Sequence, residues 1–184
     1  MKTTEKLIAV LIDGDNANPK KMAQTLAQIE QIGTIALKRV YGDFSQQNLN
    51  VWKDCVNKHS IKAIQSFAYT KGKNSTDIAL IIDAMDILHE AKINSFCIVS
   101  SDCDFTGLIH RIKENGMYAI GCGKDDSCIS FKTACDEFIL EEEPNENKTF
   151  LKPRINKIKN DQQTFKVPTE KLRGLKILGK MNIA

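Results

Sequence analysis

Long apolar stretches are missing from this sequence. None of its 184 residues lies in an uninterrupted apolar run near the ~20 residues that a membrane-spanning helix requires, so we expect no membrane association. The short apolar run near the N-terminus is interrupted by Asp13, and no small-residue cleavage pattern follows it. We therefore expect no signal peptide and a cytoplasmic location.

The usual cysteine signatures are also missing. The sequence has no Cys-x-x-Cys pair and no alternation of cysteine and histidine at zinc-site spacing. In a cytoplasmic protein we expect the cysteines to be reduced thiols with packing roles. They are Cys55, Cys97, Cys103, Cys122, Cys128 and Cys135.

Charge is unevenly distributed along the chain. Residues 1–144 carry 16 basic and 20 acidic side chains, a net charge of −4, whereas residues 145–184 carry 10 and 3, a net charge of +7. Hydrophobic periodicity also stops after Pro144. We therefore predict one folded domain over residues 1–143 and a basic linker and tail over 144–184. The tail either docks on the domain or stays partly disordered, or else binds RNA or a protein partner.

Strand-length apolar runs alternate with helical patterns, which predicts an α/β fold. The architecture is a three-layer α/β/α sandwich, Rossmann-like, around a mostly parallel sheet of five or six strands, of which the last is an edge strand. The candidate strands are Leu7–Ile12, Ile35–Tyr41, Ile61–Phe67, Phe96–Ser100, Tyr118–Cys122 and Glu137–Leu140. The candidate helices are Pro19–Ile32, Gln46–Lys58, one from Ser75 or Thr76 through Leu88, one from Asp102 or Phe105 to about Gly116, and Ile129–Cys135.

Acidic residues follow three of these strands. Asp13 ends the first strand, and Asp102 and Asp104 follow the fourth, while Asp77 lies in the first turn of the helix after the third. A strand order of 3-2-1-4-5 would make the first and fourth strands neighbours, so that Asp13 and Asp102 face each other in the crevice at the carboxyl ends.

Singly, each of these aspartates is suited to capping a helix. Together they would repel one another strongly, and a bound divalent cation is the usual means of keeping such a group ionised. Oxygen ligands favour Mg²⁺ or Mn²⁺. We therefore predict a metal site whose ligands are Asp13, Asp102 and Asp104, with Asp77 either a fourth ligand or a base that orients water.

Three strings carry a resemblance to a known family: LIDGDN at residues 11–16, KGKNSTDIALIIDAMD at 71–86 and CIVSSDCDF at 97–105. In this order and spacing, residues 6–142 resemble the NYN domain, a PIN-like nuclease family, and especially its bacterial LabA-like branch. The resemblance implies a PIN-like sandwich and metal-dependent RNA cleavage. It maps the acidic positions of the family onto Asp13, Asp77, Asp102 and Asp104, with Asn16 and Ser101 as supporting polar groups.

The predicted function is therefore a metal-dependent ribonuclease that cleaves single-stranded RNA endonucleolytically. Lys73, four residues before Asp77, either contacts the scissile phosphate or is an ordinary solvated lysine. A homodimer is compatible with the sequence. Two other functions stay open: a regulatory module that binds RNA or protein through a vestigial site, and a haloacid-dehalogenase-like phosphatase with Asp13 as nucleophile.

Neighbouring residues are given structural roles. For Asp15 we favour capping of the turn after the first strand over metal binding, and for Asp43 a turn role over a position in the crevice. Asp83 and Asp86 lie well inside their helix and face away from Asp77, so we do not expect them to be ligands. Roles in RNA binding are possible but less favoured than ordinary strand roles for Lys38, Arg39 and Tyr41. Trp52 is expected to pack a helix against the sheet.

Overall fold

The computed structural model describes residues 5–67, 74–90 and 92–141. Its centre is a parallel sheet in the order β3-β2-β1-β4-β5-β6. The strands are β1 (Leu7–Asp13), β2 (Thr34–Gly42), β3 (Lys62–Gln65), β4 (Ser95–Val99), β5 (Tyr118–Gly123) and β6 (Glu137–Leu140). The predicted α/β fold and strand order are confirmed, and β6 lies at an edge of the sheet.

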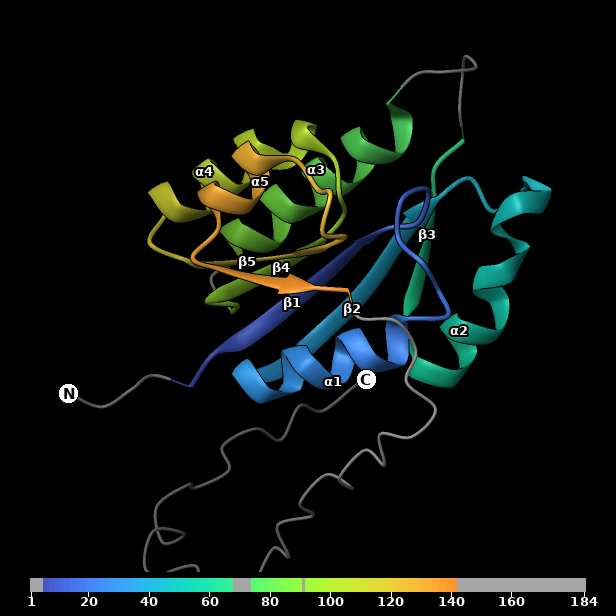
Figure 1. Cartoon of the computed structure of the whole chain (residues 1–184), viewed down its shortest axis with the longest axis horizontal. Coiled ribbons are helices and arrows are strands. Elements are labelled where there is room, and N and C mark those ends of the chain that lie inside the picture. The colour runs from blue at the N-terminus through green and yellow to red at the C-terminus, as the bar shows by residue number, and fades with distance from the viewer. Residues whose placement is uncertain (1–4, 68–73, 91, 142–184) are drawn as a thin grey trace, which may run out of the picture. The chain divides into compact units, whose positions relative to one another are not determined.

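Helices cover both faces of the sheet, as Figure 1 shows. One face packs against α1 (Met22–Ile32) and α2 (Trp52–His59), and the other against α3 (Ser75–His89), α4 (Thr106–Glu114) and α5 (Ile129–Ala134). Two short 3-10 helices, η1 (Gln47–Val51) and η2 (Cys103–Phe105), precede α2 and α4. The three layers are those of the predicted sandwich.

The central strands divide their side chains between two cores. Ile8, Val10 and Ile12 of β1 pack toward α1 and α2, whereas Ala9 and Leu11 pack toward α3, α4 and α5. All five are fully buried, and burial on both faces explains why the run is continuously apolar. The two cores hold β1 and β4 side by side, which fixes where the chain leaves each strand.

The first helix begins three residues later than predicted. Asn18 accepts a hydrogen bond from the Lys20 amide (3.0 Å) and so closes a turn of its own instead of capping α1. The helix ends before Gly33 as expected, but for another reason. The backbone of Gly33 is extended, and a Cβ there would lie 2.6 Å from the carbonyl oxygen of Lys6. Glycine is required here by the close approach of the chain entering β1.

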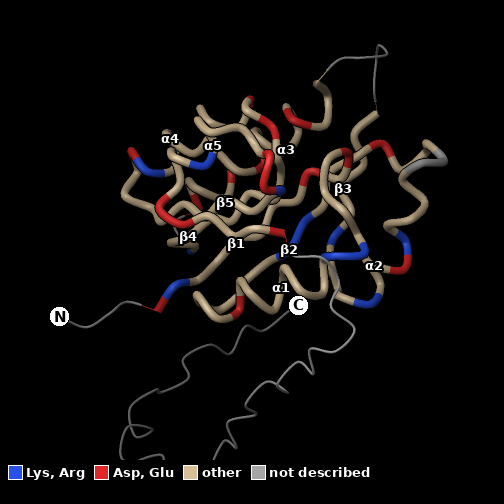
Figure 2. Tube along the Cα trace, viewed as in Figure 1, with Lys and Arg blue, Asp and Glu red and all other residues tan. Residues whose placement is uncertain are grey.

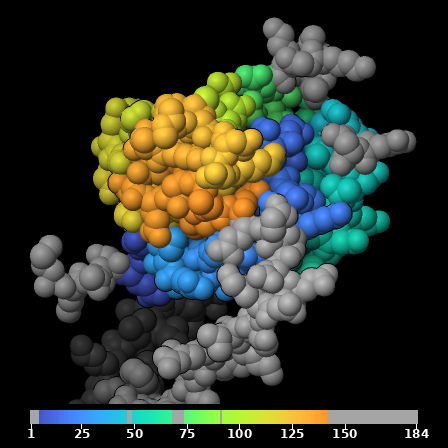
Figure 3. Space-filling model, in the orientation of Figure 1, coloured from blue at the N-terminus to red at the C-terminus, as the bar shows by residue number. Residues whose placement is uncertain are grey.

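The predicted helix over residues 46–58 is divided into η1 and α2 at Trp52. The Trp52 side chain is buried, and its indole Nε1 donates to the carbonyl of Gly14 (3.0 Å). This confirms the packing role of Trp52 and ties α2 to the turn after β1. In Figure 3 the blue surface of that turn lies between the teal surface of η1 and α2 and the gold surface of the segment after β5.

No helix within the described ranges is long and apolar enough to cross a membrane. Lys73 and the tail over 144–184 lie outside the described residues. The predicted domain boundary stays a prediction.

Candidate metal centre

Three carboxylates meet at the carboxyl end of the sheet. Asp77 lies in the first turn of α3, Asp102 is the N-cap of η2, and Asp104 belongs to η2 itself. One carboxylate oxygen from each lies within 4.8 Å of the other two. We call these three residues the acidic cluster.

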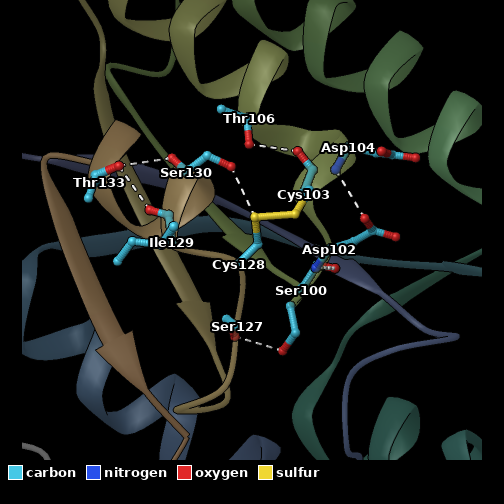
Figure 4. The surroundings of a disulfide bond; sticks show 11 residues. Ser100, Asp102, Cys103, Asp104, Thr106, Ser127, Cys128, Ile129, Ser130 and Thr133 are labelled. Atoms are coloured by element: carbon cyan, nitrogen blue, oxygen red, sulfur yellow. Dashed lines mark hydrogen bonds between the residues drawn. A yellow bond between two sulfur atoms is a disulfide. The ribbon is translucent and has the colours of Figure 1, made fainter.

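Backbone contacts fix the cluster on the β4 side. The Asp104 amide donates to Asp102 Oδ1 (3.0 Å), as Figure 4 shows, and the Asp102 amide donates to Ser100 Oγ (3.1 Å). Asn74 Nδ2 donates to Asp104 Oδ2 (3.2 Å), which joins the start of α3 to η2. Asp102 is thus a helix cap, but each carboxylate keeps lone pairs for a cation. Capping and metal binding are compatible in these residues.

Asp13 lies beneath the cluster and is not one of its three members. Its side chain is fully buried and accepts three hydrogen bonds. The Asp15 amide donates to Oδ1 (3.1 Å), whereas Asn16 Nδ2 (2.6 Å) and Ser100 Oγ (2.8 Å) donate to Oδ2. The Ser100 hydroxyl therefore connects Asp13 to Asp102, which realises the predicted proximity of the exits of β1 and β4.

Negative charge accumulates around Asp77. Its pKa is raised to about 6, first by burial and then by the charges of Asp13, Asp102 and Asp104. Burial also raises the pKa of Asp13, although the hydrogen bonds from Asn16 and Ser100 counteract the shift. Among the described side chains, no lysine or arginine forms an ion pair with these four carboxylates. In Figure 2, red acidic positions gather near the first turn of α3.

The cluster fits a small divalent cation. At metal–oxygen distances of 2.0–2.1 Å, two oxygens on opposite sides of Mg²⁺ are roughly 4.2 Å apart. The three carboxylate oxygens are within 4.8 Å of one another, so small rotations of exposed or half-buried side chains would complete the contact. A cation there would also offset the repulsion that raises the pKa of Asp77.

The two predicted supporting residues act at different places. Asn16 holds Asp13 directly. Ser101 is turned toward the exit of β5, where its Oγ accepts from the Lys124 amide (3.2 Å) and from Ser127 Oγ (2.9 Å). It supports the chain after β4 through these hydrogen bonds, which lead away from the acidic cluster. Ser100, which sequence reasoning treated only as the end of a strand, makes the contacts expected of Ser101.

The expectation of six reduced cysteines is wrong for one pair. Cys103 and Cys128 form a disulfide with Cα atoms 5.4 Å apart, whereas the other four cysteines are free thiols. The pair is 25 residues apart in sequence and has no recognisable spacing. It forms because β4 and β5 are neighbours, which brings the segments after them together.

Nearby polar residues serve the scaffold. Asp83 forms an ion pair with Arg39 and accepts a hydrogen bond from the Tyr41 hydroxyl, which ties α3 to β2. Asp43 binds the side chain of Ser45 (2.5 Å), and this turn role is the predicted one. Lys38 Nζ donates to the carbonyl of His59 (2.5 Å).

The chain is similar to another protein in sequence and to a solved structure in fold. An uncharacterized protein of Methanocaldococcus jannaschii, MJ0482, is 27% identical over an alignment of 162 residues, with 78% of this chain and 62% of that protein covered. The chain thus spans less than two thirds of this relative. The crystal structure of a protein of unknown function from Vibrio parahaemolyticus, VPA0982, has a TM-score of 0.62 and 14% identity, with 78% of this chain and 97% of that chain covered. This likeness shows the fold.

The sequence profile of the NYN domain matches residues 7–142. The match includes all six strands, the acidic cluster and Asp13. NYN domains are PIN-like nuclease domains, and a group of carboxylates at this end of the sheet accords with that class. The chain belongs to the NYN domain family.

Proposed function

We propose that this protein is a ribonuclease of the LabA-like branch that hydrolyses phosphodiester bonds of single-stranded RNA endonucleolytically with Mg²⁺ or Mn²⁺. The observation that carries the proposal is the acidic cluster, with its oxygens within 4.8 Å of one another, in a domain of the NYN family. RNA is the substrate that the family resemblance implies.

In this proposal Asp77, Asp102 and Asp104 hold the cation. When bound, a divalent cation polarises a phosphoryl oxygen and lowers the pKa of a coordinated water. Asp13 positions the site from below, because Ser100 Oγ contacts both its carboxylate and the amide of Asp102. Asp13 is a first-sphere ligand only if the burial of its carboxylate is relieved on binding.

Asp77 has two compatible assignments, ligand or proton acceptor. Burial raises its pKa and would make it a better proton acceptor toward an attacking water, whereas a bound cation would lower that pKa and favour the ligand role. Lys73 is proposed to contact the scissile phosphate. It precedes Asn74, whose side chain contacts Asp104.

The phosphatase alternative finds no support in the geometry. A covalent aspartate must reach the phosphorus atom, but Asp13 is fully buried and both its oxygens accept hydrogen bonds. A regulatory module would bind through the same surface as a ribonuclease but would not cleave the RNA. Measuring cleavage is therefore the decisive test.

The full chain should cut a single-stranded RNA labelled at its 5′ end when Mn²⁺ or Mg²⁺ is added, and EDTA should abolish cleavage. Internal fragments in the earliest products would establish endonucleolytic action, whereas stepwise shortening would point to an exonuclease. The same RNA as a duplex serves as the comparison substrate. A chain that binds RNA but cuts it with neither metal would support the regulatory alternative.

Cation binding should weaken below about pH 6. Protonation of Asp77, whose pKa is about 6, removes one negative charge and one ligand from the cluster. A Mn²⁺ titration followed by electron paramagnetic resonance should give lower affinity at about pH 5 than at about pH 7.5, since an ordinary aspartate is ionised at both values. Asp77→Asn should flatten this dependence, whereas Asp86→Asn, an exposed carboxylate on the same helix, should retain it.

A further inference from the structure

The disulfide lies inside the candidate metal centre. Cys103 stands between two members of the acidic cluster, Asp102 and Asp104, and Cys128 is the residue before α5. The bond therefore joins the segment after β4 to the segment after β5. Figure 4 shows the sulfur bridge beside the hydrogen bond between Asp102 and Asp104.

We propose that Cys103 and Cys128 form a thiol–disulfide exchange site, and that its redox state sets the affinity of the acidic cluster for a divalent cation. The inference rests on the proposed metal site but not on the identity of the substrate. The disulfide state binds the cation more tightly, and the dithiol state binds it more weakly.

The bond is accessible to a reductant. Cys103 is exposed and Cys128 is half-buried. The other thiols are poor competitors, because Cys55, Cys97 and Cys122 are buried and Cys135 is half-buried. Burial raises the pKa values of Cys122 and Cys135 to about 12, so few of these thiols ionise near neutral pH. Exchange is therefore directed to the pair at the metal centre.

The exchange is chemically complete with a dithiol as the co-reactant. One thiolate of the dithiol attacks the exposed Cys103 Sγ, the bond between Cys103 and Cys128 breaks, and Cys128 leaves with the electron pair and takes up a proton. The second thiol of the reductant then releases Cys103 as a thiol and becomes oxidised to a disulfide. Ser130 Oγ lies 3.0 Å from Cys128 Sγ and can donate a hydrogen bond to the departing sulfur.

Reduction changes the cluster without dismantling the domain. Phe105 is fully buried, Thr106 Oγ1 donates to the Cys103 carbonyl (2.6 Å) and Ser127 contacts Ser101 (2.9 Å). Neither of these two contacts involves a sulfur atom, so we expect them to persist in the dithiol state. What is lost is the covalent link at the residue between two ligands, so Asp102 and Asp104 are held by hydrogen bonds alone and become more mobile. Ordering them again on binding costs conformational entropy, and affinity falls for that reason.

The test measures Mn²⁺ affinity by electron paramagnetic resonance on the full chain, oxidised or treated with dithiothreitol. We expect reduction to weaken binding about tenfold, the scale on which groups that orient metal ligands act. Cys103→Ser and Cys128→Ser should both show the affinity of the reduced wild type and should not respond to dithiothreitol. Cys135→Ser leaves the pair intact and should respond as the wild type does, and circular dichroism confirms that each variant is folded.

Peptide mapping of the oxidised chain must find the Cys103–Cys128 link, and its absence would overturn the inference. Equal Mn²⁺ affinities in the two redox states would also overturn it, while leaving the proposed metal site intact. If neither state binds Mn²⁺, the proposed function fails and the inference fails with it. Redox-dependent Mn²⁺ binding without RNA cleavage would support the inference and contradict only the proposed ribonuclease activity.

Discussion

Asp102→Asn should reduce RNA cleavage by at least about 100-fold, since a bound cation contributes several kcal/mol of transition-state stabilisation and each 1.36 kcal/mol is a factor of ten in rate. The change is nearly isosteric. The amide oxygen of Asn can still accept the hydrogen bond from the Asp104 amide, so η2 should keep its conformation. The variant therefore removes one negative charge from the acidic cluster with little effect on the fold.

The measurement is single-turnover cleavage of single-stranded RNA over a range of Mn²⁺ concentrations. Partial recovery at high Mn²⁺ would show that the defect lies in cation affinity, whereas a rate that stays low at saturation would place it in the chemical step. Asp54→Asn, which alters an exposed carboxylate in the first turn of α2, is the matched control and should cut at the wild-type rate. Undiminished cleavage by Asp102→Asn would contradict the proposed function.

Much of the fold was predictable because the central strands β1, β4 and β5 are buried on both faces. The continuous apolar run from Leu7 to Ile12 can bury all its side chains only in a sheet that is covered on both faces. Right-handed crossover connections between parallel strands then restrict the strand order. Helix starts were less predictable. Asn18 is equally suited to a turn and to a cap, and the structure uses it for the turn.

The site was predictable in composition but not in its internal arrangement. Sequence spacing placed four aspartates at the correct end of the sheet, yet it ranked Asp13 with Asp102 as the firmest ligands. The structure groups Asp77 with Asp102 and Asp104 and leaves Asp13 beneath them. How deeply the side chain at the end of a strand is buried depends on how the following turn folds. Here the Gly14 amide donates a hydrogen bond to the carbonyl of Tyr41 (2.8 Å), which holds the turn after Asp13 against β2. The disulfide likewise depends on tertiary proximity.

Two substitutions of Asp13 should distinguish the effect of its volume from the effect of its charge. Asp13→Ala leaves the buried Ser100 hydroxyl without its acceptor, whereas the amide of the exposed Asn16 can turn to water. We expect a loss of about 3 kcal/mol in the free energy of unfolding, measured by urea denaturation, from unsatisfied groups and a small cavity. Asp13→Asn keeps the volume and an acceptor for the Asp15 amide, and it removes a charge that burial disfavours. Its NH2 group replaces the oxygen that accepts from Asn16 and Ser100, so Ser100 must accept where it now donates and Asn16 must turn to water. Its loss of stability should therefore be smaller than that of Asp13→Ala.

The pH dependence of Mn²⁺ binding by the folded Asp13→Asn variant then reports on the charge of Asp13. The charge of Asp13 is the largest contribution after burial to the raised pKa of Asp77, so its removal should lower that pKa. The pH at which Mn²⁺ binding is half lost should therefore be lower than in the wild type. The Mn²⁺ affinity near neutral pH should separately fall about tenfold, because Ser100 no longer orients Asp102 as before. An unchanged pH midpoint in a folded variant would mean that Asp13 acts only through packing and hydrogen bonds. A lower pH midpoint of Mn²⁺ binding would mean that the negative charge of Asp13 acts electrostatically on Asp77 in the metal centre.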